Sequence, residues 1–298
     1  MIQPFDDRDG EIWIDGAFVP WRDAKLHVLT HALHYGSGVF EGERMYNGAI
    51  FKLTEHTERL FYSARTLGFE IPYSIAEIDD VCKEVCERNN IVDGYIRPFA
   101  WRGSEMMAVS AQAAKIHVAV AAWTWPSYFS PELREKGISL MTASYKRPAP
   151  DTAPVHAKAA GLYMICTISK HQAEAKGFTD ALFLDHRGYV SEGTGANIFF
   201  LMEDGKIHTP KPDCFLDGIT RRTVIDLAKK RDLEVVERYI LPDEMAAAKE
   251  VFFTGTAAEV TPIGRIDDMT FKVGDVTRLL WQDYEKVVGK VPASQSAA

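Results

Sequence analysis

The sequence predicts a mixed α+β protein of two domains, and three observations support that class. The chain holds 298 residues, which is about twice the roughly 150 residues of one ordinary domain. Segments with strand and helix patterns follow one another without the regular strand–helix alternation of a doubly wound sheet. A stretch with two prolines, 125–131, separates the halves. We therefore expect a smaller N-terminal α+β domain at 1–124, a connection at 125–136 and a larger C-terminal domain at 137–298.

The composition excludes several classes of protein. Hydrophobic residues make up 46% of the chain and charged residues 26%, which is ordinary for a globular protein and excludes disorder as its main state. The net charge of −8, without a dense run of Lys and Arg, argues against nucleic-acid and anionic-membrane partners. Apolar runs such as 116–123 are too short to span a bilayer, and the polar, acidic residues 1–10 do not resemble a secretory signal. We therefore expect a cytoplasmic protein, with its four cysteines buried and reduced.

The first half contains signals for two hairpins, two helices and two longer strands. Asp-Gly and Asn-Gly pairs inside alternating apolar segments are typical of two-residue hairpin turns. A Ser-x-x-Glu capping box predicts the start of a helix. We expect hairpins at 11–18 about Asp15-Gly16 and at 39–53 about Asn47-Gly48, a helix at about 55–67 with Thr54 as N-cap, a helix after the Ser74–Glu77 capping box, and strands at 95–101 and 116–123.

The second half combines a three-stranded meander with helices of apolar periodicity. We expect a strand at 138–144, a helix at about 156–176 ended by Gly177, meander strands at 181–184, 189–192 and 198–202, helices near 220–230 and 276–288, and strands at 235–240 and 251–254. Gly193-Thr194-Gly195 lacks the third glycine of a dinucleotide-binding loop and precedes a strand, so we interpret it as a turn of the meander.

Two charged residues stand in apolar surroundings. Lys158 lies among small apolar residues at the start of the predicted helix, where a cation opposes the helix dipole. It is either an exposed lysine at a helix end or an amine nucleophile with a lowered pKa. Glu192 ends an apolar strand, so it is either a solvated strand end or a buried carboxylate that requires a cationic partner.

Other candidates are two turns, an arginine and a group of histidines. The turns 217–220 and 254–258 combine small residues with hydroxyls, which is the composition of an anion-binding cradle. Alternation puts Arg97 and Tyr95 on one face of a strand, where Arg97 meets either an internal carboxylate or a bound anion. His27, His31 and His34 have the spacing of a metal-binding helix face but no acidic ligand nearby, which favours structural histidines and no metal.

Six short motifs occur in an informative order along the chain. HALHYGSGVFEG at 31–42 is followed by YIRP at 95–98, AKAAG at 157–161, SEG at 191–193, GITR at 218–221 and TGTAAE at 254–259. Together they resemble the branched-chain amino acid aminotransferases, which are fold-type IV pyridoxal-phosphate enzymes with the D-amino acid aminotransferase-like fold. The resemblance runs from about residue 12 to residue 266.

The resemblance implies a site for pyridoxal 5'-phosphate. Lys158 matches the lysine that binds this cofactor covalently and transfers the proton, and Glu192 matches the carboxylate beside the pyridine nitrogen. Tyr163 matches the tyrosine near the phenolic oxygen of the ring. The residues implied to hold the phosphate are Arg59, Ile219, Thr220 and Thr256.

The resemblance also implies a substrate pocket that two subunits complete. The residues of the same chain would be Phe40, Tyr95, Arg97, Tyr128 and Ala257, and those of the partner subunit would be Tyr35, Met107 and Val109. A homo-oligomer follows, either a dimer or a dimer-based hexamer. Ala108 and Ala196 depart from the family pattern, which has glycine and an acidic residue there, and these departures leave the side-chain specificity open.

The implied activity is the exchange of the amino group of Leu, Ile or Val with 2-oxoglutarate. Three activities of the same fold remain alternatives: D-amino acid aminotransferase, (R)-amine aminotransferase and aminodeoxychorismate lyase. Arg97 within YIRP favours the branched-chain type. A cofactor-free binding protein on the same scaffold is a further alternative, against which the presence of both Lys158 and Glu192 argues.

Overall fold

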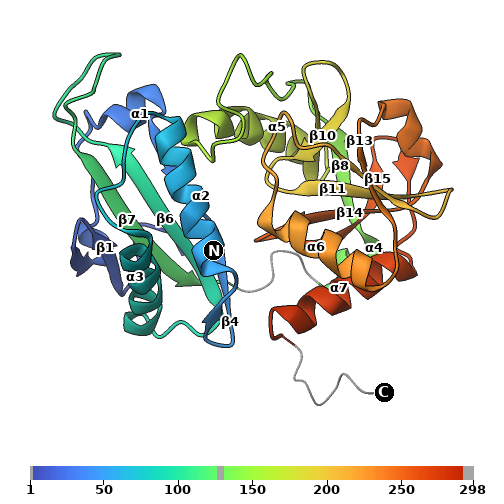
Figure 1. Cartoon of the computed structure of the whole chain (residues 1–298), viewed down its shortest axis with the longest axis horizontal. Coiled ribbons are helices and arrows are strands. Elements are labelled where there is room, and N and C mark those ends of the chain that lie inside the picture. Colours follow the sequence, from blue (N-terminus) through green and yellow to red (C-terminus); the bar gives the residue numbers. More distant parts are fainter. Residues whose placement is uncertain (1–2, 126–130, 291–298) are drawn as a thin grey trace. The chain divides into compact units, whose positions relative to one another are not determined.

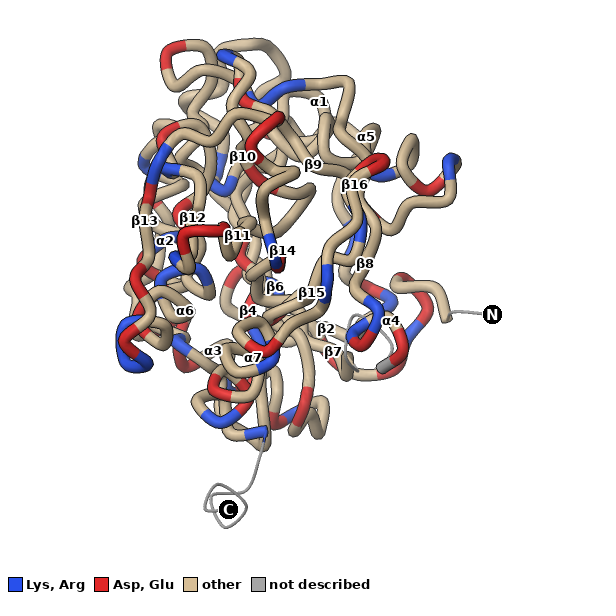
Figure 2. Tube along the Cα trace, turned by 90° about the vertical axis from the view of Figure 1, so that its right-hand side faces the viewer, with Lys and Arg blue, Asp and Glu red and all other residues tan. Residues whose placement is uncertain are grey.

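The computed structural model describes residues 3–125 and 131–290 and contains both helices and sheets, as the mixed α+β class requires (Figure 1). The chain divides into two compact units. Unit 1 comprises Met1–Pro126 and Ala157–Leu162, and unit 2 comprises Ser127–His156 and Tyr163–Ala298. Acidic and basic residues are interspersed along both units (Figure 2).

Unit 1 is built on a seven-stranded sheet with the order β2-β1-β7-β6-β4-β5, in which β3 pairs with β6. Both expected hairpin turns are confirmed, because the two central residues of each have the positive φ that a two-residue hairpin requires: 50° and 95° at Asp15-Gly16, and 49° and 80° at Asn47-Gly48. The second hairpin is shorter than the expected 39–53, because residues 38–40 pair with β6 and a helix begins at Leu53. The strands are β1 (Glu11–Ile14), β2 (Ala17–Pro20), β3 (Gly38–Phe40), β4 (Glu43–Tyr46), β5 (Ala49–Ile50), β6 (Gly94–Arg102) and β7 (Ile116–Thr124).

Unit 1 contains the helices α2 (Leu53–Thr66) and α3 (Ile75–Arg88) (Figure 1). These two helices supply most of the helical side chains in the core of the unit. The capping box at Ser74 and Glu77 is confirmed. The expectation of Thr54 as N-cap is wrong, because α2 begins at Leu53, two residues before the expected start, with Lys52 at the N-cap. The Thr54 hydroxyl instead donates to Asp79 Oδ2 of α3 at 2.6 Å, a tertiary contact that the local sequence does not reveal.

Glu43 of β4 is a buried carboxyl in this unit. Alternation puts it on the same sheet face as Met45, which belongs to the core, and its side chain is 0% exposed. Neither carboxyl oxygen has a hydrogen-bond partner among the described residues. Burial, together with the charges of Glu41 and Asp79, raises the pKa of Glu43 well above its usual range. The group is therefore protonated in the folded protein under conditions that ionise it in the unfolded chain.

Replacement of Glu43 by glutamine should remove a pH-dependent loss of stability. Because the folded-state pKa is raised, the wild type is destabilised as pH rises from the unfolded pKa, about 4.3, towards the folded one, by up to about 1.4 kcal/mol per pH unit. The glutamine of Glu43→Gln cannot ionise. The melting temperature of the variant minus that of the wild type should therefore increase from pH 5 to pH 8. Thermal melts of both proteins across this range test it, and a constant difference would show that Glu43 does not titrate in this way.

Unit 2 is built on a nine-stranded sheet with the order β10-β9-β8-β15-β14-β11-β12-β13, to which β16 adds beside β15. Because β10 also pairs with β11, six of these strands close into a ring. The expected meander is confirmed as β9, β10 and β11. The strands are β8 (Ile138–Thr142), β9 (Asp180–Leu184), β10 (Val190–Gly193), β11 (Asn197–Met202), β12 (Ile207–Pro210), β13 (Val235–Arg238), β14 (Ala248–Gly255), β15 (Glu259–Ile266) and β16 (Met269–Thr270).

The helices of unit 2 are α4 (Pro131–Lys136), α5 (Met164–Ala175), α6 (Ile219–Lys230) and α7 (Asp275–Val287). The last two agree with the expected helices near 220–230 and 276–288. The four cysteines are free and buried, as expected from their spacing. None of the helices in the described part of the chain combines the length and the apolar character needed to cross a membrane.

The segment around Lys158 differs from the expectation. We expected a helix from about residue 156, but a 3₁₀ turn occupies Ala160–Tyr163 and α5 begins at Met164. Lys158 itself is extended, because the Phe40 amide donates to the Lys158 carbonyl at 3.1 Å and Val39 forms a bridge with Ala159. This pairing assigns the segment to unit 1, whereas the sequence analysis grouped it with the C-terminal domain.

Candidate active site

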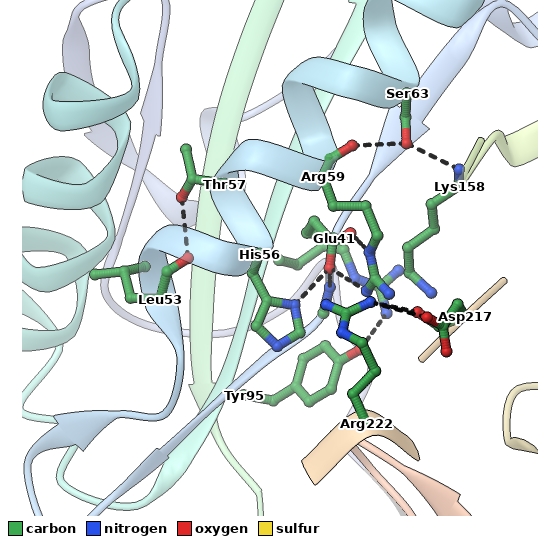
Figure 3. Close-up of polar contacts among 12 residues, drawn as sticks. Glu41, Leu53, His56, Thr57, Arg59, Ser63, Tyr95, Lys158, Asp217 and Arg222 are labelled. Atoms are coloured by element: carbon green, nitrogen blue, oxygen red, sulfur yellow. Dashed lines mark hydrogen bonds and ion pairs between the residues drawn. The ribbon is translucent and has the colours of Figure 1, made fainter. Parts of the chain in front are cut away.

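Lys158 is held through its backbone on two sides within unit 1. Its amide donates to Ser63 Oγ at 3.0 Å, and its carbonyl accepts from Phe40 of β3 (Figure 3). Ser63 is 0% exposed, and its hydroxyl donates in turn to the Arg59 carbonyl at 2.8 Å. The backbone of Lys158 is therefore fixed by α2 and β3, independently of its side chain.

The amine of Lys158 has a lowered pKa. Burial is the largest cause, the positive charge of Arg59 acts in the same direction, and the negative charge of Glu41 opposes both. The helix dipole that we expected to act on it does not, because α5 begins six residues later. A lysine whose pKa is lowered is more often the neutral amine that attacks a carbonyl carbon.

Glu41 lies beside Lys158 as the centre of a buried charged cluster. Arg59 donates from Nε and Nη2 to the two oxygens of Glu41 at 2.6 and 2.8 Å, and His56 Nδ1 lies 2.7 Å from Oε2 (Figure 3). Burial would raise the pKa of Glu41, but the charge and hydrogen bonds of Arg59, with the bond from His56, hold it well below its usual range. Burial lowers the pKa of His56, so its imidazole is the neutral form and donates through Nδ1–H.

Arg59 was among the residues implied by the family resemblance, whereas Glu41 and His56 were not. Glu41 stood inside the motif at 31–42, yet nothing local marks its carboxylate as functional. Its partners lie 15 and 18 residues further along the chain, one turn apart on α2, and only the packing of α2 on the sheet brings them to it.

Arg97, Tyr95 and Phe40 lie together, as the alternation and the resemblance predicted. Arg97 Nη2 donates to the Tyr95 hydroxyl at 3.3 Å, and the guanidinium carbon lies 4.7 Å from the centre of the Phe40 ring. No carboxylate pairs with Arg97 among the described residues, and its buried Nε has no hydrogen-bond partner there. The alternative of an internal ion pair is therefore not realised, and the cation is available to a bound anion.

Glu192, the acidic candidate of the sequence, lies in unit 2. Its Oε1 forms an ion pair with Arg147 Nε at 3.2 Å, and its Oε2 lies 3.5 Å from Asn197 Nδ2. Of the two alternatives for Glu192, the buried carboxylate with a cationic partner is therefore the one realised. That partner, Arg147, was not among the predicted residues. Tyr163 lies in unit 2 immediately before α5, with its side chain packed on a small core cluster.

The two turns that were expected to bind an anion both lie in unit 2. Helix α6 begins at Ile219 and Thr220 with Gly218 as N-cap and no capping side chain, so its first N–H groups are not satisfied by a cap. A Cβ on Gly218 would lie 2.2 Å from Asn197 Oδ1, so a larger residue here would displace the Asn197 side chain. Thr256 and Ala257 form the turn between β14 and β15, next to Thr254, whose buried hydroxyl has no partner among the described residues.

The residues expected to serve a partner subunit are on the surface of unit 1. Tyr35, Met107 and Val109 are 46%, 42% and 86% exposed. His31 is buried beneath them, with Nε2 2.8 Å from the Ala108 carbonyl and Nδ1 2.6 Å from Ser37 Oγ. Tyr128, which was expected to contact the substrate, lies outside the described residues.

The histidines expected to be structural have hydrogen-bond partners. Besides the bonds of His31, His34 Nε2 lies 2.9 Å from the Val28 carbonyl. Within the described ranges, one group of possible metal ligands converges elsewhere, at Asp185, His186 and Cys214. Arg187 Nη2 lies 2.6 Å from Asp185 Oδ2, and burial raises the pKa of the Cys214 thiol to about 12. The guanidinium thus supplies the positive charge there, and the thiol is protonated.

The chemistry of these groups fits one kind of cofactor. Unit 1 contains a lysine with a lowered pKa, and unit 2 contains an ion-paired carboxylate and a helix start without a capping side chain. Groups of these kinds suit an aldehyde, a ring nitrogen and a phosphate. Residues 38–266 match the family described as amino-transferase class IV. The chain belongs to this family, and its cofactor is pyridoxal 5'-phosphate.

Proteins that resemble this chain include three with informative descriptions. The branched-chain-amino-acid aminotransferase of Pseudomonas aeruginosa is 44% identical over 295 residues, and the match covers 96% of this chain and 96% of that protein. The branched-chain amino acid aminotransferase of T.th., in a structure with pyridoxamine 5'-phosphate, has a TM-score of 0.91 at 42% identity, covering 96% of both chains. The same enzyme complexed with N-(5'-phosphopyridoxyl)-L-glutamate has a TM-score of 0.90, with the same identity and coverage. The family and fold implied by the six motifs are therefore confirmed.

Proposed function

We propose that this aminotransferase exchanges the amino group of L-leucine, L-isoleucine or L-valine with 2-oxoglutarate. The observation that carries the proposal is Arg97, a cation without a carboxylate partner among the described residues, set between the aromatic rings of Phe40 and Tyr95. Such a pocket accepts an apolar side chain against its rings and an acidic one at its guanidinium. The relatives named for branched-chain amino acids, and the solved complex that contains a glutamate adduct, support both halves of this pairing.

The cofactor roles follow from the family motifs and from the chemistry of each residue. Lys158 would bind the cofactor covalently and move the proton at the substrate Cα, and Glu192 would keep the pyridine nitrogen protonated. When bound, pyridoxal 5'-phosphate supplies an electron sink for the Cα–H bond. The phosphate would be held by Arg59, by the amides of Ile219 and Thr220 and by Thr256, and Tyr163 would donate to the phenolic oxygen. Ala257 would complete the substrate pocket.

A panel of amino donors tests this function. Both enantiomers of leucine, isoleucine, valine, alanine and 1-phenylethylamine are each supplied with 2-oxoglutarate, and glutamate formation is measured. We expect the L-branched-chain acids to give the highest kcat/KM. Preference for D-alanine or for (R)-1-phenylethylamine would instead identify one of the alternative aminotransferases, and pyruvate release from aminodeoxychorismate would identify the lyase.

Arg97→Leu should selectively impair the half-reaction with glutamate. Losing one partner of a buried charge pair costs roughly 2–5 kcal/mol, so kcat/KM for glutamate should fall by about 30-fold or more. Leucine carries no distal charge and should be affected much less. Single-turnover rates with each donor, measured separately, check this, with Arg97→Lys as the variant that retains the charge. Equal losses for both donors would mean that Arg97 holds the pocket or the shared α-carboxylate.

We also propose a homo-oligomer based on a dimer. Val28, Leu33, Tyr35, Met107 and Val109 are apolar or aromatic side chains between 42% and 86% exposed on unit 1. Large exposed apolar side chains are typical of a protein–protein interface, and a second copy of this chain is the partner that the family resemblance implies. A solution mass equal to that of one chain would contradict this proposal.

A further inference from the structure

Glu41 determines the direction of the Arg59 side chain. Its two oxygens accept from Nε and Nη2 of the guanidinium at 2.6 and 2.8 Å, which fixes both the plane and the rotation of the group (Figure 3). In this side-on arrangement, Nη1 is turned away from the carboxylate. A single hydrogen bond would leave the guanidinium free to rotate about it, but a bidentate pair does not.

Glu41 is itself held rigidly. Its amide donates to the Pro98 carbonyl of β6 at 2.9 Å, and His56 Nδ1–H donates to Oε2 at 2.7 Å. The side chain is 0% exposed, so solvent does not compete for its oxygens. The position of the Arg59 guanidinium is therefore fixed by the sheet, through Glu41, as well as by its own helix, α2.

Glu41 also acts on the charge of Lys158. Arg59 and Glu41 influence the lysine amine in opposite directions: the guanidinium disfavours its protonated form, and the carboxylate favours it. The pair therefore provides a cation on α2 while limiting the effect of that cation on the amine of Lys158.

We propose that Glu41 is a positioning residue for the cofactor, which aims Arg59 at the cofactor phosphate and offsets the charge of Arg59 at Lys158. This inference rests on the proposed roles of Arg59 and Lys158. Glu41 itself does not touch the cofactor. It acts on the phosphate through Arg59 and on the amine of Lys158 through its electric field.

The test measures the dissociation constant of pyridoxal 5'-phosphate for four proteins besides the wild type: Glu41→Gln, Arg59→Gln, the double variant of both, and Glu43→Gln. Each holoenzyme is dialysed, and bound cofactor is quantified from its absorbance. Glutamine preserves the shape of Glu41 but removes its charge, so Arg59 loses its fixed orientation. We expect Glu41→Gln to bind the cofactor about 10- to 100-fold more weakly, the range for one charge-assisted hydrogen bond.

Glu43→Gln is the matched control. Glu43 lies two residues away on β4, is equally buried and undergoes the same substitution, but it has no hydrogen-bond partner among the described residues. Cofactor affinity should remain within about twofold of the wild type in this variant. A loss similar to that of Glu41→Gln would show that any buried substitution here weakens binding, and it would overturn the inference.

The double variant decides whether Glu41 acts through Arg59. If it does, removing Glu41 from a protein that already lacks Arg59 changes nothing further, so the double variant should match Arg59→Gln. The double variant leaves no unpaired buried charge, so the comparison holds even if Glu41→Gln alone fails to fold. Losses that add would overturn the inference. Unchanged affinity in Glu41→Gln beside weakened affinity in Arg59→Gln would overturn it as well, while the proposed phosphate site would stand.

A spectroscopic titration separates positioning from a general loss of structure. The pH midpoint of the cofactor absorbance change should fall in Glu41→Gln, because a negative charge is removed near Lys158, and it should rise in Arg59→Gln. Shifts in the same direction in both variants would contradict the opposing effects of the two residues. If Arg59→Gln changes neither the affinity nor the midpoint, the proposed role of Arg59 itself fails.

Discussion

Lys158→Ala is expected to abolish transamination and to leave the protein folded. The structure holds this residue through its amide and its carbonyl, on Ser63 and Phe40, and alanine keeps both bonds. The substitution removes the amine with the methylene chain that carries it, and the loss of a covalent nucleophile typically costs roughly 10⁴-fold or more in turnover. Turnover with leucine and 2-oxoglutarate, together with the cofactor absorbance band that borohydride bleaches in the wild type, checks this.

The matched control for this prediction is Lys176→Ala, which removes an exposed lysine at the end of α5. It should retain both the absorbance band and the turnover of the wild type. Circular dichroism of both variants should match that of the wild type. Turnover of Lys158→Ala within about tenfold of the wild type would reject the assignment of the nucleophile.

Glu192→Gln is expected to lower turnover by at least about 100-fold, the effect typical of removing a positioned group that handles a proton. Glutamine has nearly the same shape and still lies within reach of Asn197, so the strand should keep its register. The negative charge is lost, and Arg147 then lacks its ion-pair partner. The pyridine nitrogen would no longer face an anion, so electrons from the Cα–H bond would be accepted less readily.

Single-turnover rates with leucine test the role of Glu192. Glu203→Gln is a suitable control, because Glu203 is exposed at the end of the β11–β12 hairpin. Glu192→Asp, which restores the charge at a shorter reach, should recover part of the rate. If Glu192→Gln turned over as fast as the wild type, Glu192 would serve only as the ion-pair partner of Arg147.

Features that depend on neighbours in sequence could be predicted from the residues alone. The Asp15-Gly16 and Asn47-Gly48 turns, the capping box at Ser74 and the meander strands need only local propensity and alternation. The same is true of Arg97 beside Tyr95, since two residues at spacing two on one strand share a face. The family followed from six short motifs in the correct order, and it brought Lys158, Glu192 and Arg59 with it.

Features that depend on tertiary packing could not be predicted in this way. The helix expected from residue 156 begins at Met164, because Lys158 and Ala159 pair with β3 instead of continuing the helix. Likewise, Thr54 bonds to α3 instead of capping α2.

The ion pairs around the candidate site also depend on tertiary packing. The sequence determined which ionisable residues the protein possesses, and it showed that Lys158 and Glu192 stand in apolar segments. Only the tertiary structure decided which charged residues pair. Glu41 forms its ion pair with Arg59, 18 residues further along the chain, and Glu192 forms its ion pair with Arg147, 45 residues earlier. The physical reason is that burial and charge pairing set the pKa of each group, and both depend on distances through space.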